Sequence, residues 1–473
     1  MKLQICCILA SIILVKGQMV QLSVEAQASY VNFTCPSKRA IRPCQCTVVP
    51  DIPTVQCGGV RSLKTIRAAL KGWLRNDPIP YLQIVDARFV GLPSRAFVSV
   101  NVSRLEIRDS NLRWVASDAF NGLHSLMILI LHNVKLMTFP SESLSHLSSL
   151  VSLQLPRNRL SSISYHHLRS ANKLKLLSLA ENRLTFVERD SFPTTLVSLT
   201  LSKNYLRSLN KSVRNLPRLE SLSIDDNRLI DVEGELDGLY SLKYLNLARN
   251  MIRNLGVSLR QLRNLEFLDL QYNSLHEIGT SLKHLSNLKS LNLSKNRLVH
   301  LNAIDFNKLS KLKHLDLAGN SIVFISEAFH PLLSLETLDL SQNLMRNFTF
   351  DDVRLLSKLK VLDLNDNRLE YLISGYSSNI LQTERLFFAR NKIISLGEFL
   401  RHFVCLESID LSFNQLRILK TLDYTVSNNM EYISVSGNPL ICDEEQMSVY
   451  HELRNRNIEV DGQPQCNIDV MHL

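Results

Sequence analysis

Leucine and other apolar residues recur along most of the chain with one fixed spacing. The frame is Leu-x-x-Leu-x-Leu-x-x-Asn-x-Leu, and gaps of 22 to 24 residues separate thirteen asparagines, namely Asn158, Asn182, Asn204, Asn227, Asn250, Asn273, Asn296, Asn320, Asn343, Asn367, Asn391, Asn414 and Asn438. Extending the frame backwards places Ala87, Ser110 and Val134 at the same phase, which gives about 16 repeats. A fixed period of this length predicts a repeat architecture rather than several separate domains.

Each repeat contains a short alternating segment, such as Leu291-Asn292-Leu293, whose leucines point to one side of a strand. One such strand cannot bury its apolar face alone, so successive coils must stack. The asparagine amide both donates and accepts, and we expect it to satisfy backbone groups in its own turn and in the next coil. The pattern therefore predicts an α/β solenoid with a parallel concave β-sheet. Phenylalanines ten residues after the asparagine phase, such as Phe120 and Phe306, fill its mostly irregular or short-helical convex side.

The start of the chain has the pattern of a secretory signal peptide. Lys2 precedes an apolar run from Ile5 to Val15, and residues 15–17 suit a cleavage site, with a cut after Ala28 as the alternative. Removal of residues 1–17 takes away two lysines, which lowers the net charge from +10 to +8. No later segment has 18 uncharged apolar residues, so we expect no membrane span and a secreted, extracellular protein in which residues 18–34 lead into the first domain.

Cysteine usage agrees with an oxidising compartment. Two of the nine cysteines leave with the signal peptide, and the other seven are Cys35, Cys44, Cys46, Cys57, Cys405, Cys442 and Cys466. The early cluster lacks the paired Cys-x₂-Cys units of a zinc ribbon, so disulfides are favoured over a metal site. An odd number remains, which makes Cys405 either a free thiol or the site of an intermolecular bridge, such as a disulfide-linked dimer.

Residues 79–440 resemble the extracellular leucine-rich repeat family, which implies a horseshoe-shaped solenoid with disulfide caps at both ends. The resemblance implies a cysteine-rich N-terminal cap over residues 35–78, with Cys35 paired to Cys46 and Cys44 to Cys57. It also implies a reduced C-terminal cap over residues 441–466, closed by a Cys442–Cys466 bridge and followed by a tail over residues 467–473. Residues 41–47, 105–107 and 119–123 are in addition similar to arthropod secreted repeat proteins named after the non-catalytic subunit of a shrimp luciferase.

The strand residues between the leucines face the concave side, and in the later repeats many are acidic. Asp316, Asp339 and Asp363 are examples, and they form a patch that would attract a basic partner. Exposed aromatic residues are enriched at binding hot spots, so we place a binding centre near Tyr244, Phe267 and Tyr272, beside Asp269. The alternatives are structural: aspartate between two leucines is common in this repeat, and aromatic rings also pack on neighbouring side chains.

Two further sets of residues bear on extracellular chemistry. A basic residue follows the frame asparagine in several repeats and suits a sulfated glycan, or is a solvated flank: Arg159, Arg183, Arg228, Arg297, Arg368 and Lys392. Five Asn-x-Ser/Thr sequons are candidate glycosylation sites: Asn32, Asn101, Asn210, Asn292 and Asn347. A glycan on Asn292 would cover part of the concave sheet, since this residue lies between two leucines.

No catalytic motif, nucleotide-binding glycine motif, metal-ligand set or cofactor site is recognisable in the sequence. Secretion also argues against nucleic acid as a partner. We therefore expect a non-enzymatic recognition protein that binds an extracellular protein ligand through its concave face, in a cell-surface, matrix or innate-immune context. The alternative is a non-catalytic structural or carrier subunit of a secreted complex.

Overall fold

The computed structural model describes residues 35, 41–49, 52–70, 79–98, 100–419, 427–441 and 443–462. They belong to two compact units, one ending at Asn250 and the other beginning at Met251. The expected signal peptide, the sequon at Asn32 and the expected Cys442–Cys466 bridge lie outside the described residues.

The first unit begins with a disulfide-linked hairpin. Strands β1 (Cys44–Val49) and β2 (Ile52–Gly58) pair antiparallel with Cys44 opposite Cys57, and helix α2 (Leu63–Leu70) follows. Disulfides join Cys35 to Cys46 and Cys44 to Cys57, which is the pairing implied by the family resemblance. From β2 onward the sheet is parallel: β3 (Ile79–Val85), β5 (Val102–Arg108), β7 (Ile128–His132), β8 (Ser152–Gln154), β10 (Leu176–Ser178), β12 (Ser198–Thr200), β13 (Ser221–Ser223) and β14 (Tyr244–Asn246).

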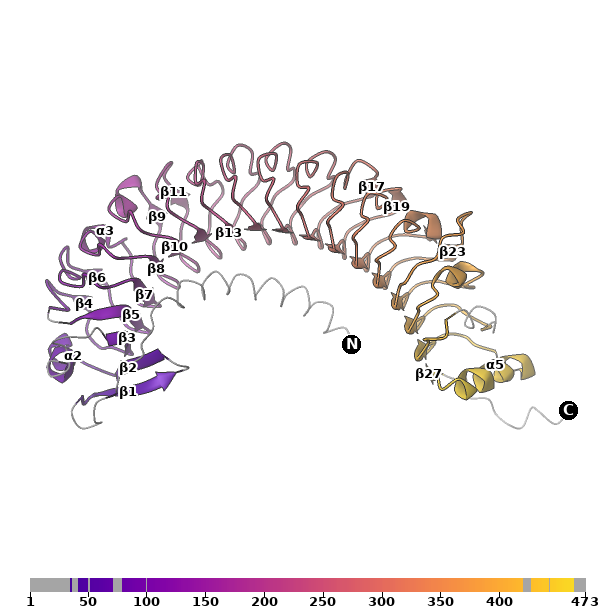
Figure 1. The fold of residues 1–473 in the computed structure, drawn as a ribbon, viewed down its shortest axis with the longest axis horizontal. Helices are drawn as coiled ribbons and strands as arrows, with labels where there is room; N and C mark the ends of the chain where they lie inside the picture. The colour runs from indigo at the N-terminus through magenta and orange to yellow at the C-terminus, as the bar shows by residue number, and fades with distance from the viewer. Residues whose placement is uncertain are drawn as a thin grey trace. The chain divides into compact units, whose positions relative to one another are not determined.

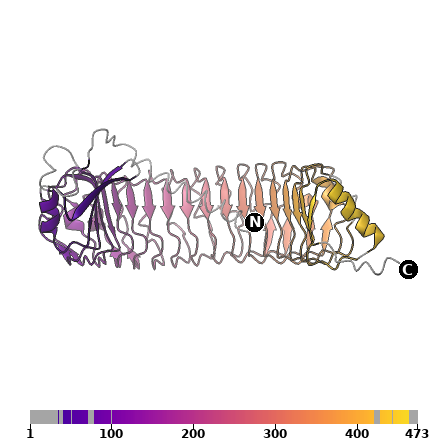
Figure 2. The same cartoon turned by 90° about the horizontal axis from the view of Figure 1, so that it is seen from below.

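The second unit repeats the same construction with short strands (Figures 1 and 2). Its parallel sheet contains β15 (Phe267–Asp269), β16 (Ser290–Asn292), β18 (His314–Asp316), β20 (Thr337–Asp339), β22 (Val361–Asp363), β24 (Arg385–Phe387), β25 (Ser408–Asp410), β26 (Tyr432–Ser434) and β27 (Glu459–Asp461). Helix α5 (Glu444–Asn455) precedes β27, and Asp443 caps it by accepting a hydrogen bond from the Gln446 amide at 2.8 Å.

On the side of the coils away from the main sheet, the described residues form short elements. They include four parallel pairs of strands: β4 (Gly91–Leu92) with β6 (Trp114–Val115), β9 (Ser162–Ile163) with β11 (Phe186–Val187), β17 (His300–Asn302) with β19 (Phe324–Ser326), and β21 (Asn347–Thr349) with β23 (Tyr371–Ile373). The remaining turns of helix are α3 (Ser141–Leu144), η1 (Tyr165–Leu168), η2 (Phe350–Asp352) and η3 (Phe399–His402). The expected irregular or short-helical convex side is confirmed.

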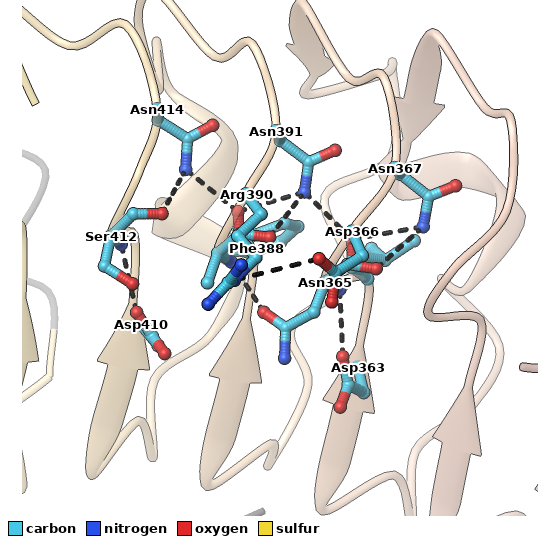
Figure 3. Close-up of polar contacts among 12 residues, drawn as sticks. Asp363, Asn365, Asp366, Asn367, Phe388, Arg390, Asn391, Asp410, Ser412 and Asn414 are labelled. Carbon is cyan, nitrogen blue, oxygen red and sulfur yellow. Dashed lines mark hydrogen bonds and ion pairs between the residues drawn. The ribbon is translucent and has the colours of Figure 1, made fainter. Parts of the chain in front are cut away.

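The frame asparagines hold the coils together by hydrogen bonds to the backbone. Asn296 Nδ2 donates to Leu293 O at 3.0 Å and to Leu270 O at 2.9 Å, and its Oδ1 accepts from the Leu275 amide at 3.0 Å. Figure 3 shows Nδ2 of Asn391 and Nδ2 of Asn414 donating in the same way, both to Phe388 O. The expectation of a link to the next coil was wrong in direction, because Leu270 and Leu275 belong to the preceding coil.

The core of each unit consists of the inward-facing leucines and the phenylalanines opposite them. The middle residue of each three-residue strand from β8 to β26 in the main sheet is buried, as Leu268 and Leu291 show at 2% and 0% exposure. On the convex side the rings of Phe306 and Phe329 stack at 6.0 Å between centroids, and both are fully buried. The predicted parallel-sheet solenoid is thus confirmed, and its construction places the two flanking residues of every strand on the opposite, concave face.

Candidate functional site

The concave face of the second unit carries a column of mostly polar side chains at the last position of strands β15 to β26. Strand register places these residues next to one another in the order Asp269, Asn292, Asp316, Asp339, Asp363, Phe387, Asp410 and Ser434. We call Asp269, Asp316, Asp339 and Asp363 the acidic column. Asp269 and Asp316 are buried, at 5% and 9% exposure, whereas Asp339 and Asp363 are half-buried.

Each acidic residue also has a structural role in its own turn. The Oδ1 atoms of Asp316, Asp339 and Asp363 accept hydrogen bonds from the amide two residues later at 2.9, 2.8 and 2.9 Å. Asn292 makes the same bond at 2.9 Å, so the bond requires an oxygen but not a charge. Figure 3 shows this arrangement at Asp363 and Asp410. The structural interpretation of these residues is therefore supported, and the same bond fixes the orientation of each carboxylate toward the concave side.

Two neighbouring carboxylates of the column influence each other's ionisation. Burial raises the pKa of Asp316 to about 7, and the negative charge of Asp339 contributes in the same direction. Burial also raises the pKa of Asp339, although the Lys295 ammonium group partly opposes this. Charged partners favour the ionised form of a carboxylate. A cation placed against this pair would therefore lower both pKa values.

Lys295 belongs to a second row of residues, which we call the rim row, at the position before each frame asparagine. In this unit it contains Tyr272, Lys295, Gly319, Gln342, Asp366, Arg390, Phe413 and Gly437, each with a positive φ between 52° and 72°. Lys295 extends across Gly319, and its Nζ donates to Gln342 Oε1 at 2.5 Å. A Cβ atom on Gly319 would lie 2.5 Å from Lys295 Cδ, so the glycine makes room for the lysine.

Further along the rim row, an acidic, a basic and an aromatic residue follow one another on successive coils. Arg390 Nε lies 3.8 Å from Asp366 Oδ1 (Figure 3). The Arg390 guanidinium carbon lies 5.3 Å from the centroid of the Phe413 ring. Tyr272 and Phe413 are 43% and 55% exposed, so they are available to a partner. Arginine and aromatic side chains of this kind are common at protein-binding hot spots.

The predicted binding centre is only partly supported by the positions of its residues. Tyr244 is a half-buried residue of the first unit, whereas Phe267, Asp269 and Tyr272 belong to the second. The expectation of an exposed Phe267 was wrong, since its side chain is only 8% exposed. Its register partner on the next strand, Ser290, is also buried. Of the two aromatic residues of the predicted binding centre that lie in the second unit, Phe267 and Tyr272, only Tyr272 is exposed.

The concave face of the first unit holds a polar network that the sequence did not reveal. The Tyr81 hydroxyl donates to Glu106 Oε2, Gln83 Nε2 donates to the Tyr81 hydroxyl oxygen at 2.7 Å, and the Arg104 guanidinium carbon lies 4.1 Å from the Tyr81 ring centroid. Burial and the bond to Glu106 raise the pKa of Tyr81 to about 12. The sequence contains one sign of this network. Tyr81 and Gln83 occupy the same repeat positions as Arg104 and Glu106 one repeat later, so strand register places the two polar pairs side by side.

The remaining predicted residues lie at separate places. Asn101 is half-buried, Asn292 is 8% exposed, and Asn210 and Asn347 are exposed. Cys405 is half-buried and is the unpaired cysteine among those that the structure describes. The basic residues of the flank are all exposed in their respective units: Arg159, Arg183, Arg228, Arg297, Arg368 and Lys392.

The described residues contain no group of three or more His, Cys, Asp or Glu side chains arranged to hold a metal ion. None of the described helices has the length and apolar character needed to cross a membrane.

Four segments of the chain match the leucine-rich repeat family, at residues 100–160, 172–229, 217–275 and 286–345. The matched segments are leucine-rich repeats. A leucine-rich repeat protein of Leptospira interrogans is 25% identical and superposes with a TM-score of 0.65, covering 79% of this chain and 93% of that one. A comparison with curated protein sequences found no match.

Two complexes contain further structures with the leucine-rich repeat fold. The Toll–Spätzle complex of Drosophila matches with a TM-score of 0.68 at 18% identity, covering 91% of this chain and 75% of that one. The ectodomain of the receptor kinase GASSHO1/SCHENGEN3 from Arabidopsis thaliana, bound to CASPARIAN STRIP INTEGRITY FACTOR 2, matches with a TM-score of 0.54 at 21% identity, covering 87% and 53%. At these identities the likeness establishes the fold.

Proposed function

We propose that this leucine-rich repeat protein is a secreted, non-enzymatic recognition protein that binds a basic segment of a protein ligand on the concave face of its second unit. The observation that carries the proposal is the acidic column, whose carboxylates are held in fixed orientations at matching positions of successive strands. Fixed charges lose little entropy on binding, so an oriented row favours a cationic ligand more than flexible surface acids do.

The rim row supplies the second element of the proposed site. Tyr272 is exposed at one end and Phe413 at the other, and Arg390 lies near Phe413. A ligand seated on the acidic column would meet these rings at its edge, where they add apolar contact area to the charge attraction. The two disulfides support an oxidising, extracellular location. The structural relatives named above were determined with Spätzle and with CASPARIAN STRIP INTEGRITY FACTOR 2, which adds support for a protein ligand.

The test compares two variants that lose the same charge. The first carries Asp339→Asn and Asp363→Asn, which keep the bond to the backbone as Asn292 does. The control carries Glu327→Gln and Glu370→Gln, which lie outside the main sheet. Wild type and both variants are used to capture proteins from the extracellular fluid of the source, and captured proteins are identified by mass spectrometry. A ligand retained by wild type and control but lost by the first variant supports the proposal.

Equal capture by all three proteins would refute binding at the acidic column. A second chain that copurifies with the protein through every step and every variant would instead favour the alternative, a carrier or structural subunit of a secreted complex.

A further inference from the structure

Two large aromatic rings are exposed on the flank of the second unit, away from the main sheet. Phe324 of β19 is 60% exposed and Tyr371 of β23 is 57% exposed. Asn347 of β21 lies at the same phase of the repeat, one coil after Phe324 and one coil before Tyr371. Strand register places it directly opposite Tyr371, and the Leu344 amide donates to Ile322 O at 2.9 Å between the other two coils. We call Phe324, Asn347 and Tyr371 the aromatic flank.

The side chain of Asn347 is exposed, and it makes no hydrogen bond within the part of the chain that the structure describes. The side chains of the sequon asparagines Asn292 and Asn210, in contrast, make hydrogen bonds. The Asn292 Oδ1 accepts bonds from the amide and hydroxyl of Ser294 at 2.9 and 2.6 Å, and this residue is only 8% exposed. Asn210 Nδ2 donates to Val187 O at 3.3 Å. Asn101 is half-buried, so among the described sequons Asn347 is the one whose side chain is exposed and makes no hydrogen bond.

We propose that Asn347 carries an N-linked oligosaccharide whose first sugars lie on the rings of Phe324 and Tyr371. The inference rests on the proposed secretion, because the modification takes place in the secretory pathway. The donor is an oligosaccharide carried on a lipid diphosphate. Asn347 Nδ2 forms a bond to the anomeric carbon and loses one proton, while the bond from that carbon to the diphosphate oxygen breaks and the lipid diphosphate leaves.

The chemistry of the two rings fits this occupant. One face of a pyranose ring presents C–H groups, which pack on the electron-rich face of an aromatic ring. A glycan attached at Asn347 is already held between Phe324 and Tyr371, so it covers them without the cost of bringing a separate molecule to the surface. Clustered exposed aromatic rings on a monomer otherwise mark an association or aggregation surface. A glycan here closes the flank to protein partners and leaves the concave face open.

The experiment uses the full chain secreted from eukaryotic cells. Mass spectrometry measures occupancy at Asn347, and the rate at which a peptide-N-glycosidase releases the Asn347 glycan from the native protein is compared with the rate after Phe324→Ser and Tyr371→Ser. The matched control is Phe186→Ser, a 50% exposed ring on a short flank strand of the first unit. We expect high occupancy, and release at least several-fold faster from the flank variant than from wild type or the control.

An unmodified Asn347 in a chain that carries glycan at its other sequons would overturn the inference. Equal release rates from wild type and the flank variant would remove the role of the rings. A second preparation, in which a foreign signal peptide precedes the full chain, distinguishes failure of the proposed secretion from failure of the proposed glycosylation. If the protein reaches the medium only with the foreign signal peptide, the proposed secretion is contradicted. The occupancy of Asn347 in that preparation still tests whether this residue carries a glycan.

Discussion

Asp316 and Asp339 occupy matching positions of the adjacent strands β18 and β20, so two carboxylates lie side by side on the concave face. Both accept a hydrogen bond from the backbone of their own turn, and both are shifted toward the protonated form by burial. Because Asn292 makes the same backbone bond without a charge, the fold does not require this pair to be acidic. The cost of burying two neighbouring carboxylates is one that a cationic ligand would offset.

The raised pKa of Asp316 predicts a stability that falls as pH rises. Below about pH 4 the group is protonated in both the folded and the unfolded chain. Between pH 4 and about 7 the unfolded chain releases its proton first, so the folded state binds more protons and the free energy of unfolding decreases with pH. We expect Asp316→Asn to flatten this dependence and to stabilise the protein at pH 8, by an amount on the order of 1–3 kcal/mol.

Urea unfolding of the Asp316→Asn protein at several pH values between 4 and 8 checks this prediction, with Asp410→Asn as the control at the same strand position. Parallel pH profiles of wild type and Asp316→Asn would contradict it. The same linkage predicts that a basic ligand of the acidic column binds more tightly at pH 8 than at pH 6, because binding requires the ionised carboxylates.

The frame asparagines should be among the most sensitive positions of the chain. Asn296 is 7% exposed, and its side chain bonds to four backbone groups on two coils. Alanine at this position leaves an amide and three carbonyls without this partner, so we expect Asn296→Ala to lower the free energy of unfolding by about 3 kcal/mol. Asn302→Ala, on an exposed strand position of the flank, is the control and should change it by less than about 0.5 kcal/mol. Equal effects in chemical unfolding would argue against the ladder as a major source of stability.

Substitution of Gly319 can distinguish the cost of backbone strain from the cost of a side-chain collision. Gly319 and Gly279 both have positive φ, 66° and 55°, but a Cβ on Gly279 would meet nothing within 4 Å, whereas one on Gly319 would meet Lys295. We expect Gly279→Ala to cost about 1 kcal/mol from strain alone and Gly319→Ala to cost more. Adding Lys295→Ala should recover the difference. Thermal unfolding of wild type, the two glycine variants and the Gly319→Ala/Lys295→Ala double variant measures these losses. Equal losses of stability for Gly279→Ala and Gly319→Ala would contradict the prediction.

The solenoid could be derived from the sequence because its determinants are local and repeated. The spacing of Asn296 from Leu291 and Leu293 specifies a strand and a turn in every coil, and stacking follows from the apolar side that each strand must bury. The candidate site was harder, because exposure depends on neighbours in other coils. Phe267 is covered by residues in register with it, Tyr81 is held by Glu106, and Lys295 reaches Gln342 two coils away. These contacts join residues of different coils, 23 to 47 positions apart, so the pattern within a single repeat does not mark them.

The burial of Phe267 changes the expected result of mutating the predicted binding centre. Truncation of a large buried side chain removes apolar contacts, so we expect Phe267→Ala to lower the free energy of unfolding by about 3 kcal/mol. Tyr272→Ala removes a 43% exposed ring and should leave stability within about 1 kcal/mol of wild type while weakening ligand binding. Unfolding curves measured beside ligand affinity separate the two effects, and a stability loss as large for Tyr272→Ala as for Phe267→Ala would refute the distinction.

Cys405 is half-buried and unpaired, while the other described cysteines are joined in the N-terminal disulfides. An accessible thiol in an oxidising compartment tends to form a disulfide with another molecule or to be capped, whereas a deeply buried one stays inert. We expect a fraction of the secreted protein to migrate as a disulfide-linked dimer or conjugate on non-reducing electrophoresis, and Cys405→Ser to abolish that band without changing the monomer. The N-terminal disulfides serve as an internal control, because they remain protected from alkylation in both proteins. A single monomer band in both lanes, together with rapid alkylation of Cys405 in the native wild type, would show that the thiol stays free.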